Sequence, residues 1–170
     1  MARIKPEKEN SKDPEIQKIF AEIKRATDGK VPEAYRVFAR APRVLAANWN
    51  RTKNILGAVK IQKTEKESIA LAVSAANGCD FCVKIHSENL KKSGFKKSEI
   101  EKIKTGKSEN PTRKMILEFC VKAMISPKKV ADADFEKIKK LGFDDSEILE
   151  ILATAEMYSG YNRLLIALGI

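Results

Sequence analysis

The spacing of hydrophobic positions along the chain predicts an all-helical protein. Apolar residues recur at intervals of three or four, as in Ile16, Phe20 and Ile23, and this interval is typical of a helix that buries one face. No segment shows the alternating pattern and turn residues that a β-hairpin needs. We therefore expect helices over residues 14–28, 32–40, 42–57, 64–77, 79–94, 97–105, 111–125, 132–141 and 145–168.

Residues that favour helix ends support these boundaries. Asp13 precedes Pro14, which is the order expected of an N-cap and the first helical residue. Thr64 and Glu67 have the spacing of a capping box, in which each side chain bonds the backbone of the other residue. Residues 68–76 are small or apolar on most sides, so we expect this helix to be central and closely packed.

The chain contains an internal repeat. Residues 90–103 match residues 138–151 at an offset of 48, and the match includes Gly94 with Gly142 in the turn between two helical segments. A repeat of this kind predicts the internal duplication of a helix–turn–helix unit, with the short connections of a helical bundle. We expect residues 14–170 to form a single helical domain, preceded by a flexible tail of mixed charge over residues 1–13.

The composition limits the possible partners. The net charge is +10, and residues 1–60 carry most of the excess. The lysines in this basic N-terminal part alternate with acids, and no zinc-finger spacing or RNA-binding aromatic motif occurs, so we expect a solvated surface and no nucleic-acid partner. No apolar run reaches the length of a membrane span, so we expect no membrane partner. Three cysteines and no apolar leader in the first 13 residues predict a cytoplasmic protein.

The candidate chemistry lies in the segment Cys79-Asp80-Phe81-Cys82, followed by His86, the one histidine of the chain. Cys79, Cys82 and His86 share one helical face, because they are separated by three and four residues. A helix N-terminus favours the reactive thiolate form of cysteine. Glu67 on the preceding helix is placed to orient His86, as in other pairs of a base and an orienting carboxylate.

The alternatives for these residues are a metal site and an inert structural role. Two cysteines and one histidine supply only three ligands, and no second cysteine pair exists, so we favour a redox thiol site and expect no metal. At the repeat offset, Glu67, Cys79, Cys82 and His86 correspond to Met115, Pro127, Val130 and Asp134. The second copy therefore keeps the scaffold without these groups, which argues against a purely structural role. Cys120 lies among apolar residues, and we expect a buried core thiol there.

The pattern Glu67-x11-Cys79-x2-Cys82-x3-His86 resembles the alkylhydroperoxidase AhpD-like, carboxymuconolactone decarboxylase superfamily, over about residues 30–170. The segment 42–49 resembles the Pro-x-x-Leu helix of that family, and Asn162-Arg163 resembles its Asn-Arg near the C-terminus. The resemblance implies an AhpD-like helical bundle. It also implies that Cys82 attacks the peroxide.

Further roles follow from the same resemblance. Cys79 is expected to be the resolving cysteine, and His86 and Glu67 are expected to relay the proton. Phe81 stands where the best-studied branch has a second histidine.

The resemblance implies a thiol-dependent peroxidase that reduces alkyl hydroperoxides through a disulfide cycle, with no metal or flavin cofactor. Its implied partners are a hydroperoxide substrate, an external dithiol reductant and further copies of the same chain, in a trimer or hexamer. Two alternatives stay open. One is a thiol–disulfide oxidoreductase with little peroxidase activity, and the other is a non-catalytic helical binding module.

Overall fold

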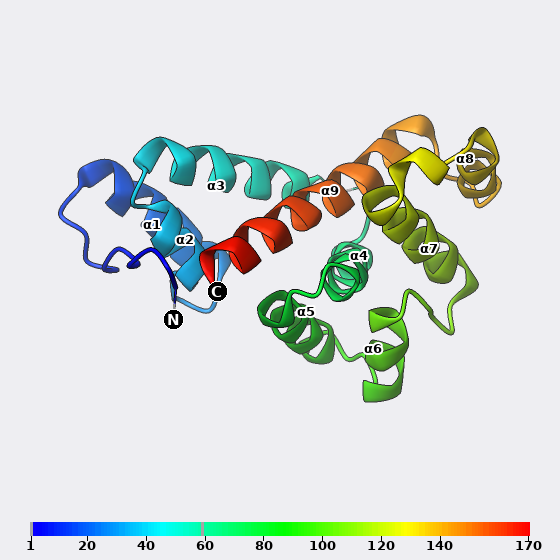
Figure 1. Cartoon of the computed structure of the whole chain (residues 1–170), viewed down its shortest axis with the longest axis horizontal. Helices are drawn as coiled ribbons and strands as arrows, with labels where there is room; N and C mark the ends of the chain where they lie inside the picture. The colour runs from blue at the N-terminus through cyan, green and yellow to red at the C-terminus, as the bar shows by residue number, and fades with distance from the viewer. Residues whose placement is uncertain (1, 59) are drawn as a thin grey trace. The chain divides into compact units, whose positions relative to one another are not determined.

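The computed structural model describes residues 2–58 and 60–170, and helices without any strand make up the regular structure of these residues (Figure 1). The all-α class predicted from the hydrophobic spacing is therefore confirmed. The elements are α1 (Pro14–Ala26), α2 (Glu33–Phe38), α3 (Pro42–Gly57), α4 (Lys63–Ala76), α5 (Asp80–Lys92), α6 (Lys97–Lys104), α7 (Pro111–Ile125), the 3-10 turn η1 (Pro127–Lys129), α8 (Asp132–Lys139) and α9 (Asp145–Leu168).

Local signals account for the helix ends. The Asp13 carboxylate accepts hydrogen bonds from the backbone N–H groups of Glu15 at 2.9 Å and Ile16 at 3.3 Å, at the start of α1. These bonds satisfy donors that a helix leaves unpaired in its first turn. Gly78 follows α4 with a φ of 72°, a backbone conformation that a residue with a Cβ rarely adopts.

One predicted helix start is wrong. Helix α4 begins at Lys63 after Gln62, and no side chain caps its first turn. Thr64 therefore lies inside the helix, and the predicted capping box with Glu67 does not form. The Glu67 carboxylate instead bonds side chains of α5.

The chain divides into two compact units, residues 1–54 with 165–170 and residues 55–164. In the first unit, α1, α2 and α3 bury Phe20, Ile23 and Leu45. Within this unit the extended segment before α1 makes backbone hydrogen bonds, such as that from Glu7 N–H to Arg36 C=O at 2.8 Å. The mobility of the tail and the single domain over 14–170 stay predictions.

The second unit is built around α4. This helix packs against α5, α6 and α7 (Figure 1), and its middle turns are fully buried, as its small apolar composition predicts. The cluster that surrounds it comprises Ile61, Ile69, Leu71, Ala72, Val73, Leu90, Ile100, Ile103, Ile116, Leu117, Cys120, Ile151 and Ala155.

The two repeat segments have the same local structure. Helices α5 and α6 are joined through Gly94, and α8 and α9 are joined through Gly142, with φ values of 88° and 96°. Helix α7 also follows α4 at close to the offset of 48 residues. Common ancestry of the two copies stays a prediction.

No helix within residues 2–58 and 60–170 combines the length and the apolar character that crossing a membrane requires.

Candidate active site

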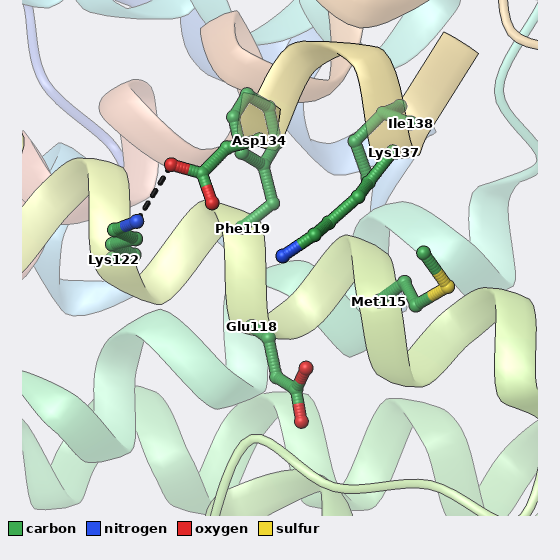
Figure 2. A pocket seen from close by; sticks show the side chains of 7 residues that line it. All are labelled: Met115, Glu118, Phe119, Lys122, Asp134, Lys137 and Ile138. Carbon is green, nitrogen blue, oxygen red and sulfur yellow. Dashed lines mark hydrogen bonds and ion pairs between the residues drawn. The ribbon is translucent and has the colours of Figure 1, made fainter. Parts of the chain in front are cut away.

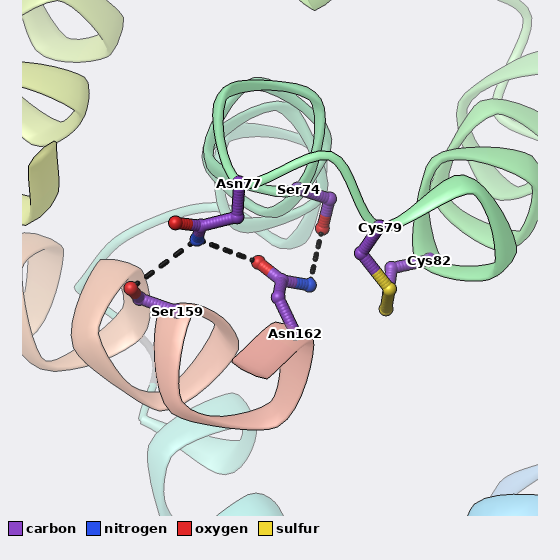
Figure 3. The surroundings of a disulfide bond; sticks show 6 residues. All are labelled: Ser74, Asn77, Cys79, Cys82, Ser159 and Asn162. Carbon is purple, nitrogen blue, oxygen red and sulfur yellow. Dashed lines mark hydrogen bonds between the residues drawn. A yellow bond between two sulfur atoms is a disulfide. The ribbon is translucent and has the colours of Figure 1, made fainter. Parts of the chain in front are cut away.

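Cys79 and Cys82 lie at the N-terminus of α5. Cys79 occupies the N-cap position and Cys82 lies in the first turn, and a disulfide joins them (Figure 3). Their Cα atoms are 5.4 Å apart, which is within the usual range for a disulfide. The two residues are only 1% and 5% exposed. The pair is therefore a buried dithiol/disulfide centre at the positive end of a helix.

His86 and Glu67 meet in the contact between α5 and α4. The Nδ1 atom of His86 lies 2.8 Å from Oε2 of Glu67, and both side chains are buried. The Asn89 amide donates a second hydrogen bond to the same oxygen at 3.2 Å. Since Glu67 engages Nδ1, the other ring nitrogen, Nε2, is the one left to exchange protons with a reacting group.

The Glu67 carboxyl stays ionised in this buried position. Burial by itself would raise its pKa, but the hydrogen bond from His86, the charge of His86 and the bond from Asn89 together lower the pKa below its usual value of 4.5. A carboxylate that is held in this form can fix the orientation of the His86 ring beside it.

Helix α9 contributes two side chains that sequence reasoning left outside the site. The rings of Tyr158 and His86 meet edge to face, with centroids 4.6 Å apart and an interplanar angle of 84°. Asn162, one turn further along α9, is fully buried. The resemblance to the family marked Asn162, but no periodicity or spacing in the sequence relates either residue to α5.

Asn162 bonds the end of α4 that leads into the cysteine pair. Its Nδ2 donates to Ser74 Oγ at 2.9 Å, and its Oδ1 accepts from Asn77 Nδ2 at 3.0 Å. Asn77 Nδ2 also donates to Ser159 Oγ at 3.2 Å. Figure 3 shows this group of amides and hydroxyls beside the Cys79–Cys82 bond.

Cys120 takes no part in this cluster. It is a free cysteine buried within α7, and burial raises the pKa of its thiol well above the ordinary range. The prediction of a core thiol is confirmed.

Within the described ranges, 2–58 and 60–170, no group of three or more His, Cys, Asp or Glu side chains is placed to hold a metal ion. What the residues can do together is exchange two electrons at the cysteine pair and a proton at His86. The structure thus brings Glu67 and His86 into contact and joins Cys79 to Cys82, while their catalytic roles stay predictions.

A pocket of about 390 Å³ lies between α7 and α8 (Figure 2). Two of its lining residues, Met115 and Asp134, stand 48 positions after Glu67 and His86. The Lys122 ammonium pairs with Asp134 at 2.6 Å. In the first copy of the repeat these two positions are occupied by a glutamate and a histidine. In the second copy they are occupied by Met115 and Asp134, which line the pocket. The complete lining is Met115, Glu118, Phe119, Lys122, Asp134, Lys137 and Ile138.

Comparison with known families and proteins places these features in context. Residues 42–105 match the Carboxymuconolactone decarboxylase family. This segment contains all four predicted site residues. An uncharacterised protein of Bacillus subtilis, YdfG, is 26% identical over 113 residues, which are 64% of this chain and 76% of that protein.

A named relative is the alkyl hydroperoxide reductase AhpD of Coxiella burnetii. It is 41% identical over 54 residues, which are 32% of this chain and 30% of that protein. The compared stretch is therefore less than a third of either protein.

Solved structures share the fold along nearly the whole chain. The alkylhydroperoxidase AhpD core of an uncharacterised peroxidase-related protein from Ralstonia eutropha superposes with a TM-score of 0.88 at 24% identity, covering 99% of this chain and 90% of the other. The debrominase Bmp8 superposes with a TM-score of 0.82 at 19% identity, covering 98% and 90%. Residues 42–105 are thus similar to the Carboxymuconolactone decarboxylase family, and the chain shares the fold of the AhpD core.

Proposed function

We propose that this protein is a thiol-dependent peroxidase that reduces alkyl hydroperoxides through the Cys79–Cys82 pair. The observation that carries the proposal is the buried hydrogen bond between Glu67 and His86, at 2.8 Å. His86 lies four residues after Cys82 on the same helix. An oriented imidazole next to a redox-active cysteine pair is the arrangement that proton-coupled thiol chemistry needs. The stretch shared with an alkyl hydroperoxide reductase supports the same reading.

The first half of the cycle oxidises Cys82. The Cys82 thiolate attacks the distal oxygen of the hydroperoxide, so that an S–O bond forms and the O–O bond breaks. The alkoxide that leaves takes a proton from His86 and departs as the alcohol. Glu67 stabilises the protonated imidazole before this transfer, and Cys82 is left as a sulfenic acid.

The second half of the cycle restores the thiols. The Cys79 thiol attacks the Cys82 sulfenic acid, an S–S bond forms and water leaves. An external dithiol then attacks this disulfide, and a mixed disulfide forms and resolves, so that the donor leaves oxidised and the protein leaves reduced. The need for a dithiol donor fits a reducing compartment such as the cytoplasm.

Thiol counting tests this proposal. The protein is reduced, freed of reductant and treated with one equivalent of cumene hydroperoxide. Wild type is expected to lose two thiols per chain, and Cys82→Ser is expected to lose none. A Cys120→Ala background removes the third thiol from the count and should behave as wild type. Retention of all thiols in wild type would contradict the peroxidase, and would leave thiol–disulfide exchange as the activity to assay.

Two variants assign the roles within the cycle. Cys79→Ser should stop at a Cys82 sulfenate that dimedone traps. His86→Ala should slow the reaction with peroxide by about a hundredfold, since a positioned acid or base contributes 10²–10⁴. A disulfide that still forms in Cys79→Ser, or wild-type kinetics in His86→Ala, would refute the corresponding role.

Reductive dehalogenation of an aromatic compound is a second candidate. The similar structure of debrominase Bmp8 was also solved as a cysteine-to-alanine variant in complex with 2,3,4-tribromopyrrole. A dithiol supplies the two electrons that this reaction needs: the aryl halide and two thiols give the arene, a disulfide and a hydrogen halide. Release of bromide from tribromopyrrole by the reduced protein, and not by Cys82→Ser, would support this second function.

A further inference from the structure

We propose that Asn162 is a positioning residue that holds the turn before Cys79 in the geometry of the disulfide, and so sets how readily the Cys79–Cys82 bond is reduced. The proposal rests on the proposed redox cycle and adds a residue of α9 to it. Asn162 is fully buried. The nitrogen and the oxygen of its side-chain amide both form hydrogen bonds with residues at the C-terminal end of α4.

The hydrogen bonds of Asn162 reach Cys79 through one further residue. Asn162 Nδ2 bonds the hydroxyl of Ser74, and the carbonyl oxygen of the same Ser74 accepts from the backbone N–H of Cys79 at 3.0 Å. Asn162 Oδ1 bonds the side chain of Asn77, two residues before Cys79. The amide therefore ties together the two ends of the turn from which Cys79 projects (Figure 3).

Reduction releases the constraint that the S–S bond places on the two cysteines. The S–S bond holds the two sulfurs closer than their contact distance, and they must separate once it is broken. Cys82 lies in the first turn of α5, whereas Cys79 is the N-cap, and the Cys79 N–H bonds the carbonyl of Ser74, whose hydroxyl Asn162 bonds. Movement of Cys79 would therefore have to displace this hydrogen-bonded turn. A clamp on this turn opposes the movement and stabilises the disulfide relative to the dithiol.

The equilibrium with glutathione tests the proposal. Two glutathiones and the protein disulfide give the protein dithiol and oxidised glutathione, and the ratio of protein forms is counted after acid quenching. Asn162→Ala is expected to shift this equilibrium about tenfold toward the dithiol, which corresponds to about 30 mV for a two-electron couple. A shift of less than twofold, or a shift toward the disulfide, would overturn the proposal.

Thr154→Val is the matched control. Thr154 is another buried residue of α9, and its hydroxyl donates to the Glu150 carbonyl of its own helix. This variant should lower the melting temperatures of the oxidised and reduced proteins equally and leave the glutathione equilibrium unchanged. Asn162→Ala should lower the melting temperature of the oxidised protein more than that of the reduced one. Equal losses in both forms would mean that Asn162 is only structural.

Ser74→Ala provides a second route if Asn162→Ala does not fold. It removes the hydroxyl that Asn162 bonds and keeps the carbonyl that Cys79 bonds, so it should shift the equilibrium in the same direction. In the double variant the two shifts should not add, because they remove the same contact. Additive shifts would refute the path through Ser74. The glutathione equilibrium is independent of peroxide, so failure of the peroxidase in the thiol count and failure of this clamp are separate results.

Discussion

Glu67 accepts two hydrogen bonds on one carboxylate oxygen, from the His86 ring and from the Asn89 amide. These bonds and the charge of His86 outweigh the effect of burial and lower the pKa of Glu67. The sequence pattern predicted the partnership of Glu67 and His86, because both residues belong to the family motif. It also predicted a capping role for Glu67 that the structure contradicts, since a capping box depends on a helix start that lies elsewhere.

Glu67→Gln is expected to change how stability depends on pH. The carboxyl has a lower pKa in the folded protein than its usual 4.5, so the unfolded chain binds this proton more tightly. Glu67 therefore contributes stability that is present above about pH 4.5 and is lost as the pH falls through the folded value. Between pH 6 and pH 3, urea unfolding should show a steeper loss in wild type than in Glu67→Gln.

The exposed Glu118 on α7 offers a control for this measurement. Glu118→Gln should reproduce the wild-type slope. If the curves of wild type and Glu67→Gln run in parallel, ionised Glu67 does not stabilise the fold.

Cys120 is expected to be inert in the native protein. Burial raises the pKa of its thiol, and the thiolate is the form that alkylating agents attack. In the reduced protein, iodoacetamide should label Cys120 only when denaturant is added, as measured by mass spectrometry of its peptide. Labelling of Cys120 at the rate of an unfolded control peptide would show that α7 opens readily.

At the scale of the helices, most helix boundaries could be predicted from residues close to them in the sequence. Asp13 with Pro14 and Gly94 act on the backbone within a few residues, so the sequence places these helix ends to within about two residues. Contacts between helices cannot be predicted from neighbouring residues in the same way. Lys66 shows this, because a lysine beside two glutamates in the sequence reads as part of a solvated face, yet it is only 1% exposed.

The Lys66 ammonium joins α4 to two other segments of the second unit. It pairs with Glu150 Oε1 at 2.6 Å and donates to the carbonyl oxygens of Ile55 at 2.7 Å and Ala58 at 2.6 Å. Lys66→Met leaves the Glu150 charge and both carbonyls without this donor. We expect a loss of about 3 kcal/mol in the free energy of unfolding, measured by urea denaturation.

Two further variants separate the causes of this loss. In Lys66→Met/Glu150→Leu the unpaired charge is removed as well, and part of the stability should return. Lys114→Met breaks an exposed pair with Glu118 whose atoms are 3.8 Å apart, and it should stay close to wild type. A single variant Lys66→Met that is as stable as Lys114→Met would show that the buried contacts of Lys66 do not stabilise the fold.

At the scale of the whole molecule, the candidate site draws on parts of the chain that the family match does not reach. The match ends at residue 105, whereas Tyr158 and Asn162 lie on α9. The four residues of the motif could be predicted because they recur at fixed spacing within one helical hairpin. The contribution of α9 could not, since it depends on how a distant helix packs against α4 and α5.

We propose, from the resemblance to the family, that the chain assembles into a trimer or hexamer. Sedimentation velocity should then give a mass that is three or six times 19.0 kDa. Leu149, an apolar residue of α9, is 67% exposed, and Leu149→Lys should weaken an assembly that covers it. Glu136→Lys, at an exposed polar position of α8, should not. A wild-type mass of one chain would contradict the assembly.

The pocket between α7 and α8 bears on how freely the sequence can change. Met115 and Asp134 occupy the positions that correspond to Glu67 and His86, but the proposed chemistry makes no demand on them. A library randomised at Met115 and Asp134 should therefore keep activity with many amino-acid pairs, whereas the same library at Glu67 and His86 should keep very few. These two positions of the pocket would then be tolerant sites, at which a new binding specificity could be introduced while the cysteine pair continues to work.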